Sequence, residues 1–97
     1  MYARVARFTG ASRESIEQNV AGIRERAGSG PPEGVPAVGF RLLADEANGT
    51  VIAIGFFETE EDMRKGDETL NTMTPPTGDM GSRASVDLCE VKLQIDS

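Results

Sequence analysis

The chain has 97 residues and a formal net charge of −6, with one cysteine, no histidine and no tryptophan. This length suits one domain with a single core that needs no disulfide or metal. The acidic balance argues against sequence-independent binding to nucleic acid or an anionic membrane, because both need a basic surface. The lack of histidine removes the commonest general base and transition-metal ligand. We therefore expect residues 1–97 to form a single domain without metal or cofactor.

The N-terminal sequence MYARVARF carries charge within its first four residues, so it predicts no signal peptide. No apolar run approaches the roughly 20 residues that a membrane-spanning helix needs. These two patterns together predict a soluble, cytoplasmic protein.

The first half of the chain reads as a strand followed by a helix. Residues 2–9 form the predicted strand, and Arg4 and Arg7 have opposite parity on it, so one guanidinium should point to each face. Ser12 is the expected N-cap of a helix that runs to about residue 27. Apolar residues at helical spacing give this helix one buried stripe.

The centre of the chain reads as an antiparallel hairpin. Asn48-Gly49 separates two apolar runs and suits a two-residue type I′ turn, which would place Phe40 opposite Phe57 and Leu42 opposite Gly55. The second run, residues 51–57, has no charge and no alternation, as is typical of a strand in the middle of a sheet. One face of the hairpin would carry Phe40, Leu42, Ala44, Ala53, Gly55 and Phe57, and the other Arg41, Leu43, Ile54 and Phe56. Because both faces are largely apolar, helices should cover one and a partner the other.

The last third reads as a helix, a loop and a strand. Thr59 is the expected N-cap of a helix over residues 59–73, and the acidic residues 60–62 suit its N-terminus. Gly66 within this helix costs about 1 kcal/mol relative to alanine, which a close approach to the sheet would compensate. Residues 74–83 are predicted to be a mobile loop. Residues 84–95 are predicted to be a strand with either a bulge or a change of neighbouring strand near Cys89.

The order of these elements is βαββαβ. It predicts a ferredoxin-like α+β fold, with a four-stranded antiparallel sheet, both helices on one face, and the first and third strands in the centre.

The chain resembles the dimeric α+β barrel superfamily, which includes antibiotic-biosynthesis-monooxygenase-like domains. The resemblance covers nearly the whole chain and rests on the opening strand Val5-Ala6-Arg7-Phe8, the hairpin with Asn48-Gly49, the strand-to-helix segment Phe56-Phe57-Glu58-Thr59-Glu60-Glu61-Asp62-Met63, and Leu70-Asn71. It implies that two copies pack their open sheet faces together as a barrel and that each subunit holds a cavity.

The resemblance also bears on activity. Enzymes of the superfamily use Asn, His and Trp to degrade haem, or Asn, Trp, Tyr and Arg to oxidise aromatic polyketides without a cofactor. This chain has no His, no Trp and no Asn in its opening strand, so the resemblance implies no haem degradation through a histidine ligand. Cofactor-free oxygenation or isomerisation of an aromatic or polyketide-like compound stays open, because the substrate itself supplies the carbanion.

Four residues are candidates for contacting such a ligand. Arg41 and Arg4 lie on predicted strands, and a guanidinium that faces a cavity would anchor a carboxylate or enolate. The alternatives for both are a salt bridge or an exposed head group with a buried stem. Tyr2 could donate to an oxyanion, or could pack at the rim of the barrel. Asn71 could polarise a carbonyl, or could cap the end of its helix.

Other residue types give no catalytic or metal site. Cys89 has no base to activate it, so it is expected in the core or an interface. The acidic run Glu58, Glu60, Glu61 and Asp62 has no EF-hand spacing, and the helix N-terminus explains it without a metal.

The sequence thus leads to two hypotheses. The first is a homodimeric barrel that binds a small, partly apolar molecule through Arg41, Tyr2, Asn71 and Arg4, with residues 74–83 as a lid. The second is a non-catalytic dimer, whose core is filled by its own side chains and which serves as an interaction or regulatory module.

Overall fold

A computed structural model describes residues 1–26, 28, 30, 34–72 and 81–95 of the 97-residue chain. Its elements follow the predicted βαββαβ order: β1 (Tyr2–Thr9), α1 (Arg13–Arg26), β2 (Gly39–Asp45), β3 (Thr50–Phe57), α2 (Glu60–Thr72) and β4 (Ser82–Glu90). The four strands form one antiparallel sheet in the order β2-β3-β1-β4. This is a ferredoxin-like α+β fold. As predicted, β1 and β3 are central.

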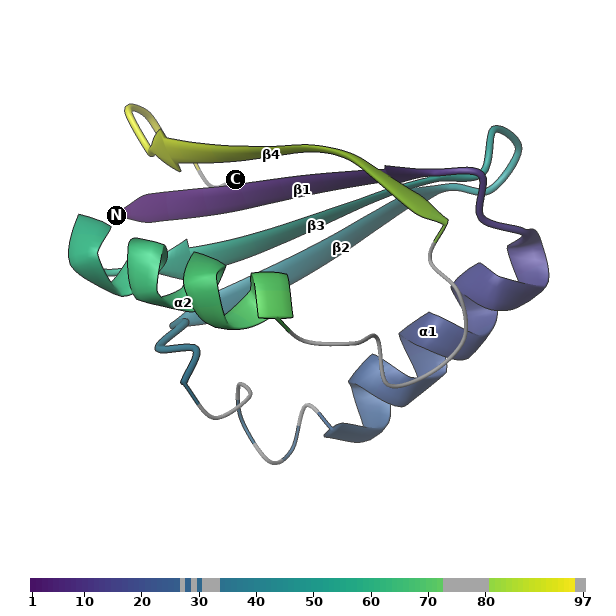
Figure 1. The fold of residues 1–97 in the computed structure, drawn as a ribbon, viewed down its shortest axis with the longest axis horizontal. Helices are drawn as coiled ribbons and strands as arrows, with labels where there is room; N and C mark the ends of the chain where they lie inside the picture. The colour runs from purple at the N-terminus through teal and green to yellow at the C-terminus, as the bar shows by residue number, and fades with distance from the viewer. Residues whose placement is uncertain (27, 29, 31–33, 73–80, 96–97) are drawn as a thin grey trace.

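Both helices lie against the same face of the sheet, and the opposite face is uncovered (Figure 1). Each helix begins at the predicted cap, since the hydroxyl of Ser12 accepts the backbone N–H of Ser15 and the hydroxyl of Thr59 accepts that of Asp62, both at 3.1 Å. These caps satisfy donors that have no partner within a helix. We call the two sides of the sheet the helix face and the open face.

The helix face buries two separate apolar clusters rather than one continuous core. The cluster under α1 contains Ala11, Ile16 and Val51, with Phe8, Val20 and Leu42 packed against it. The cluster under α2 contains Val35, Phe57 and Met63, with Tyr2, Ala37 and Leu70 packed against it. Between them, the central strands carry the small residues Ala6, Ala53 and Gly55, with Ala6 opposite Ala53 and Arg4 opposite Gly55. Ala53 is only half-buried, so the helices do not seal the middle of this face.

The hairpin has the predicted faces but not the predicted turn. Phe40 lies opposite Gly55 and Leu42 opposite Ala53, two residues away from the expected pairing. The loop is four residues long rather than two, because the Asn48 amide donates to the Asp45 carboxylate at 2.7 Å and the Asn48 backbone N–H donates to the Asp45 carbonyl at 3.2 Å. Within this loop, only Gly49 has positive φ, at 66°. A shift of two residues keeps every side chain on its predicted face.

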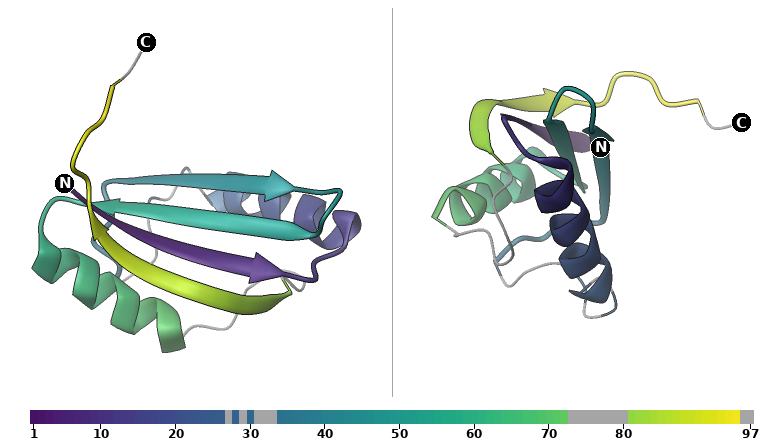
Figure 2. Two further views of the ribbon diagram at one scale, coloured as in Figure 1. Left: turned by 90° about the horizontal axis from the view of Figure 1, so that it is seen from above. Right: turned by 90° about the vertical axis from the view of Figure 1, so that its right-hand side faces the viewer.

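The structure also corrects the predicted last strand. It begins at Ser82, within the predicted 74–83 loop, and ends at Glu90, so residues 91–95 are not part of it. Arg7 pairs with Ser85 whereas Phe8 pairs with Arg83, so the irregularity lies at Ala84 and not near Cys89. Residues 74–80, which make up most of the predicted lid over residues 74–83, lie outside the described residues. The segment after β4 crosses the ends of β1, β3 and β2 and extends beyond β2 (Figure 2).

Neither helix in the described ranges is long and apolar enough to cross a membrane.

The close approach predicted at Gly66 is present. A Cβ at this position would lie 2.6 Å from Cε1 of Phe57, a side chain that is completely buried. The absence of a side chain therefore lets α2 pack directly on the ring.

We expect Gly66→Ala to lower the free energy of unfolding by about 1–3 kcal/mol, the usual cost of overpacking a core. The steric overlap with Phe57 outweighs the gain in helix propensity, which is about 1 kcal/mol. Urea denaturation measures the difference. Lys65→Ala, one residue away and exposed, is the control and should change stability little. A Gly66→Ala variant as stable as the parent would show that α2 does not rest on this ring.

Candidate functional site

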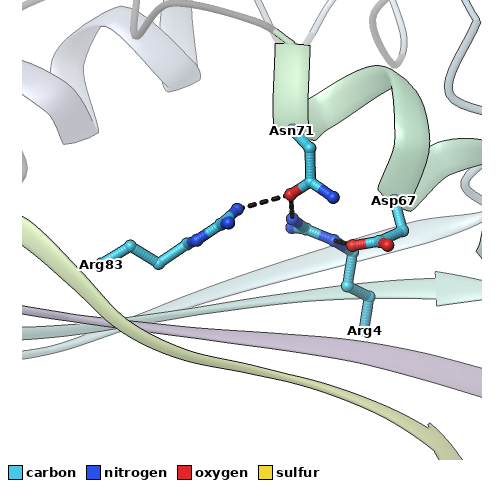
Figure 3. A network of polar contacts seen from close by, with 4 residues as sticks. All are labelled: Arg4, Asp67, Asn71 and Arg83. Atoms are coloured by element: carbon cyan, nitrogen blue, oxygen red, sulfur yellow. Dashed lines mark hydrogen bonds and ion pairs between the residues drawn. The ribbon is translucent and has the colours of Figure 1, made fainter.

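Four polar side chains meet where α2 lies over β1 and β4: Arg4, Asp67, Asn71 and Arg83 (Figure 3). Arg4 comes from the middle of β1 and points under α2. Asp67 and Asn71 are four residues apart on α2 and so project from the same side of the helix. Arg83 reaches the group from β4. We call these four residues the arginine cluster.

Arg4 is the buried member of the cluster, with 7% of the residue exposed. Its Nε donates to a carboxylate oxygen of Asp67 at 2.8 Å, and its Nη2 donates to Oδ1 of Asn71 at 3.3 Å. A buried guanidinium without a counter-charge is costly, and both α2 residues reduce this cost. The ion pair is part-buried, since the Asp67 side chain is 23% exposed. Arg4 is thus fixed in position rather than free to sample conformations.

Arg83 is exposed, as is Asn71, and a β-bulge brings Arg83 to the cluster. In a regular strand it would share the open face with Ser85, but Ala84 is an extra residue between the pairs Arg7–Ser85 and Phe8–Arg83. The extra residue turns the Arg83 side chain to the helix face, where its Nη1 donates to Oδ1 of Asn71. Bulges commonly redirect a side chain in this way.

The charges of the cluster do not cancel. Two guanidinium groups share one amide oxygen, that of Asn71, and Asp67 is the one carboxylate bound to them within the described residues. The cluster therefore carries one excess positive charge, at the edge nearest Arg83. An oxygen anion could replace the amide oxygen as the acceptor of both N–H groups, since charge-assisted bonds are the stronger ones.

The structure separates the four predicted ligand residues. Arg4 and Asn71 are in direct contact, and Tyr2 lies two residues from Arg4 on the same face, packed against the cluster of Phe57 and Met63. Arg41 lies on the open face, paired with Ile54, and is not part of the arginine cluster.

Arg41 instead lines a cleft of about 320 Å³ at the end of the sheet where β2 begins and β3 ends. The other lining residues come from four places in the chain: Met1, Val38, Gly39, Phe40, Phe56 and Gln94.

Sequence reasoning missed Asp67 and Arg83. The spacing of Asp67 and Asn71 was a usable signal for a shared helix side. No comparable signal identified Arg83, because its position depends on a bulge and on a strand that begins earlier than the composition suggests.

In the described ranges no group of three or more His, Cys, Asp or Glu residues is placed to hold a metal ion. Cys89 is exposed, which contradicts the expected core position and leaves an interface position open.

Comparison of the chain with known protein families, with curated proteins and with solved structures found no match.

The Arg4–Asp67 ion pair should contribute measurably to stability. Replacing Asp67 with Asn removes the counter-charge of a buried guanidinium but keeps the shape of the side chain. We expect a loss of about 1–3 kcal/mol in the free energy of unfolding, the usual cost of an unsatisfied buried group.

The matched control is Glu60→Gln, which breaks the exposed Arg64–Glu60 pair on the same helix. Exposed pairs contribute about 0–1 kcal/mol, so this variant should differ little from the parent in urea denaturation. Equal losses in both variants would mean that Arg4 is not buried under α2.

Proposed function

We propose that this protein binds a small, partly apolar organic molecule at the arginine cluster and that it belongs with the antibiotic-biosynthesis-monooxygenase-like group of dimeric α+β barrels. The observation that carries the proposal is the shared acceptor. Arg4 and Arg83 both donate to Oδ1 of Asn71, with one carboxylate to balance two guanidinium groups. Such an arrangement favours a ligand with one oxygen anion, a carboxylate, phenolate or enolate.

The surroundings of the cluster suit an aromatic or polyketide-like body. The neighbouring helix face is lined by small residues between two apolar clusters, and Ala53 stays partly accessible there. Tyr2 contributes an aromatic ring and a phenol on the same face as Arg4. A ligand bound by its oxygen at Arg83 would lay its rings over this apolar surface.

The chemistry that follows is stabilisation of an enolate. An acidic C–H or O–H of a polyketide-like compound loses its proton to solvent water more readily when two guanidinium groups stabilise the negative charge that develops on the substrate oxygen. The enolate carbon then reacts with oxygen or is reprotonated at another position, which gives cofactor-free oxygenation or isomerisation. In this proposal, Arg83 and Arg4 donate to the ligand oxygen, which replaces Oδ1 of Asn71 as their shared acceptor, and Asp67 keeps Arg4 oriented.

The proposal is tested by the ionisation of a bound phenol. We expect 4-nitrophenol, whose ionised form absorbs visible light, to bind as the phenolate and to show a lowered pKa in the complex. Arg83→Gln should weaken binding about tenfold, which corresponds to about 1.4 kcal/mol, and should return the phenol pKa towards its free value.

Arg7→Gln is the control for charge, because Arg7 lies on the open face of the neighbouring strand. It should leave binding unchanged. Equally weak binding in Arg83→Gln and Arg7→Gln would mean that the net charge of the protein, and not the arginine cluster, attracts the phenolate. An absence of binding to the parent protein would overturn the proposed site.

We further propose that two copies associate through their open faces. Away from the Arg41 cleft, this face presents Ile52 and Ile54 half-buried, and Leu43 is 48% exposed. The segment after β4 adds Leu93 and Ile95, which are 79% and 80% exposed. Contiguous apolar surface of this kind marks an interaction site.

Sedimentation velocity at micromolar concentration should show a dimer. Leu43→Glu places a charge on the proposed interface, at a position exposed enough to tolerate it within one subunit, and should give monomers. Lys65→Glu, on the exposed side of α2, should remain dimeric. A monomeric parent protein would contradict the association.

The alternative function is a non-catalytic dimeric module. The observation that favours it is that no buried side-chain nitrogen or oxygen in the described ranges lacks a hydrogen-bond partner, so the arginine cluster is complete without a ligand. A dimer that binds neither aromatic acids nor quinols would support this alternative.

A further inference from the structure

The cleft that contains Arg41 is separate from the arginine cluster. Arg41 and Gly39 lie on the open face, whereas Arg4, Asp67 and Asn71 lie on the helix face. The cleft is formed where the start of β2, the end of β3, the N-terminal residue and the segment after β4 meet. The sheet therefore separates a ligand in the cleft from the arginine cluster.

One end of this cleft is charged and unpaired. The guanidinium of Arg41 makes no hydrogen bond or ion pair with any residue in the described part of the chain. Two of the other three strand arginines are held, Arg4 by Asp67 and Arg83 by Asn71. Arg7 is likewise on the open face, but it does not line the cleft. The five N–H donors of Arg41 are available to a carboxylate.

The rest of the cleft is apolar and partly aromatic. Met1, Val38 and Phe40 are each about half exposed, at 50%, 52% and 51%, which is unusual for three large apolar residues at one place. Phe56 lies opposite Gly39 across the hairpin. Because glycine has no side chain, one side of the Phe56 ring faces the cleft rather than a neighbouring residue.

We infer that this cleft is a second binding site, for an aromatic monocarboxylate whose ring lies against Phe56 and Val38 and whose carboxylate is bound by Arg41. The volume of about 320 Å³ is at the lower end of the range for ligand sites, so it admits a single ring with a short acidic chain. Gln94 is the other polar residue that lines the cleft. One free guanidinium selects one negative charge.

The hairpin provides a precise way to fill the cleft. Gly39 does not have positive φ, and a Cβ built on it would meet Cδ2 of Phe56 at 3.6 Å, an ordinary contact. Gly39→Val is therefore compatible with the strand, where β-branched residues are favoured, and its methyl groups would occupy the space beside the ring. Arg41→Gln removes the charge and keeps most of the side-chain length.

The test uses 3-phenylpropionate and the full chain, with binding followed by backbone amide chemical shifts and by calorimetry. We expect the shifted amides to lie in residues 38–41, 56 and 94. Gly39→Val and Arg41→Gln should each weaken binding at least tenfold. Arg7→Gln and Arg83→Gln should leave it within about twofold of the parent. Unchanged binding in Arg83→Gln would show that the cleft binds the carboxylate without the arginine cluster. The inference about the cleft therefore stands even if the arginine cluster binds no ligand.

Three results would overturn the inference. Amide shifts confined to α2 and β4, with binding lost in Arg83→Gln, would assign the carboxylate to the arginine cluster. If Gly39→Val and Arg41→Gln alter the oligomeric state in sedimentation, and the parent binds no ligand, the cleft is a contact between copies of the chain. An absence of any saturable binding would show that the cleft is only a surface depression.

Discussion

The burial of the Arg4 guanidinium is the constraint on which the helix face of this protein depends. A charged group in the centre of a sheet must have a counter-charge and hydrogen-bond acceptors, and α2 supplies both from positions four residues apart. The same helix also packs closely at Gly66, the residue before Asp67, where the absence of a side chain lets it contact Phe57. The two contacts together fix how far α2 lies from the sheet, which side of α2 faces the sheet and where α2 lies along β1.

The bulge at Ala84 determines which β4 side chain contacts α2. Without the extra residue, Arg83 would join the open face and the cluster would hold one guanidinium and one carboxylate. With it, a second guanidinium reaches the same amide oxygen, and the local charge becomes positive. This excess charge, within a chain whose net charge is −6, is the physical reason why we propose that the cluster binds a small anion rather than a neutral molecule.

The fold was largely predictable, because it rests on short-range patterns. The parity of the apolar residues placed each hairpin side chain on its correct face, and the hydroxyls of Ser12 and Thr59 marked both helix starts. The hairpin register was wrong because the Asp45–Asn48 hydrogen bond lengthens the turn, and this competition between two turns is not visible in composition.

The candidate site was only half predictable for a related reason. Arg4 and Asn71 were identified by residue type, but Arg83 and its bulge depend on how β4 pairs with β1, which is a long-range property. Arg41 was grouped with them although the sheet separates the two faces. Strand parity alone could have made that separation, since it correctly divided Arg4 from Arg7.

The most direct test of the account is the hydrogen exchange of arginine Nε–H groups, observed by nitrogen-15 NMR at neutral pH. The account predicts a protected Nε–H on Arg4, lost in Asp67→Asn. Arg64, which makes the same type of bond to Glu60 at 3.0 Å but is exposed, provides the internal comparison and should exchange rapidly. Rapid exchange at Arg4, or protection that persists in Asp67→Asn, would contradict the buried, paired guanidinium on which the proposed site is built.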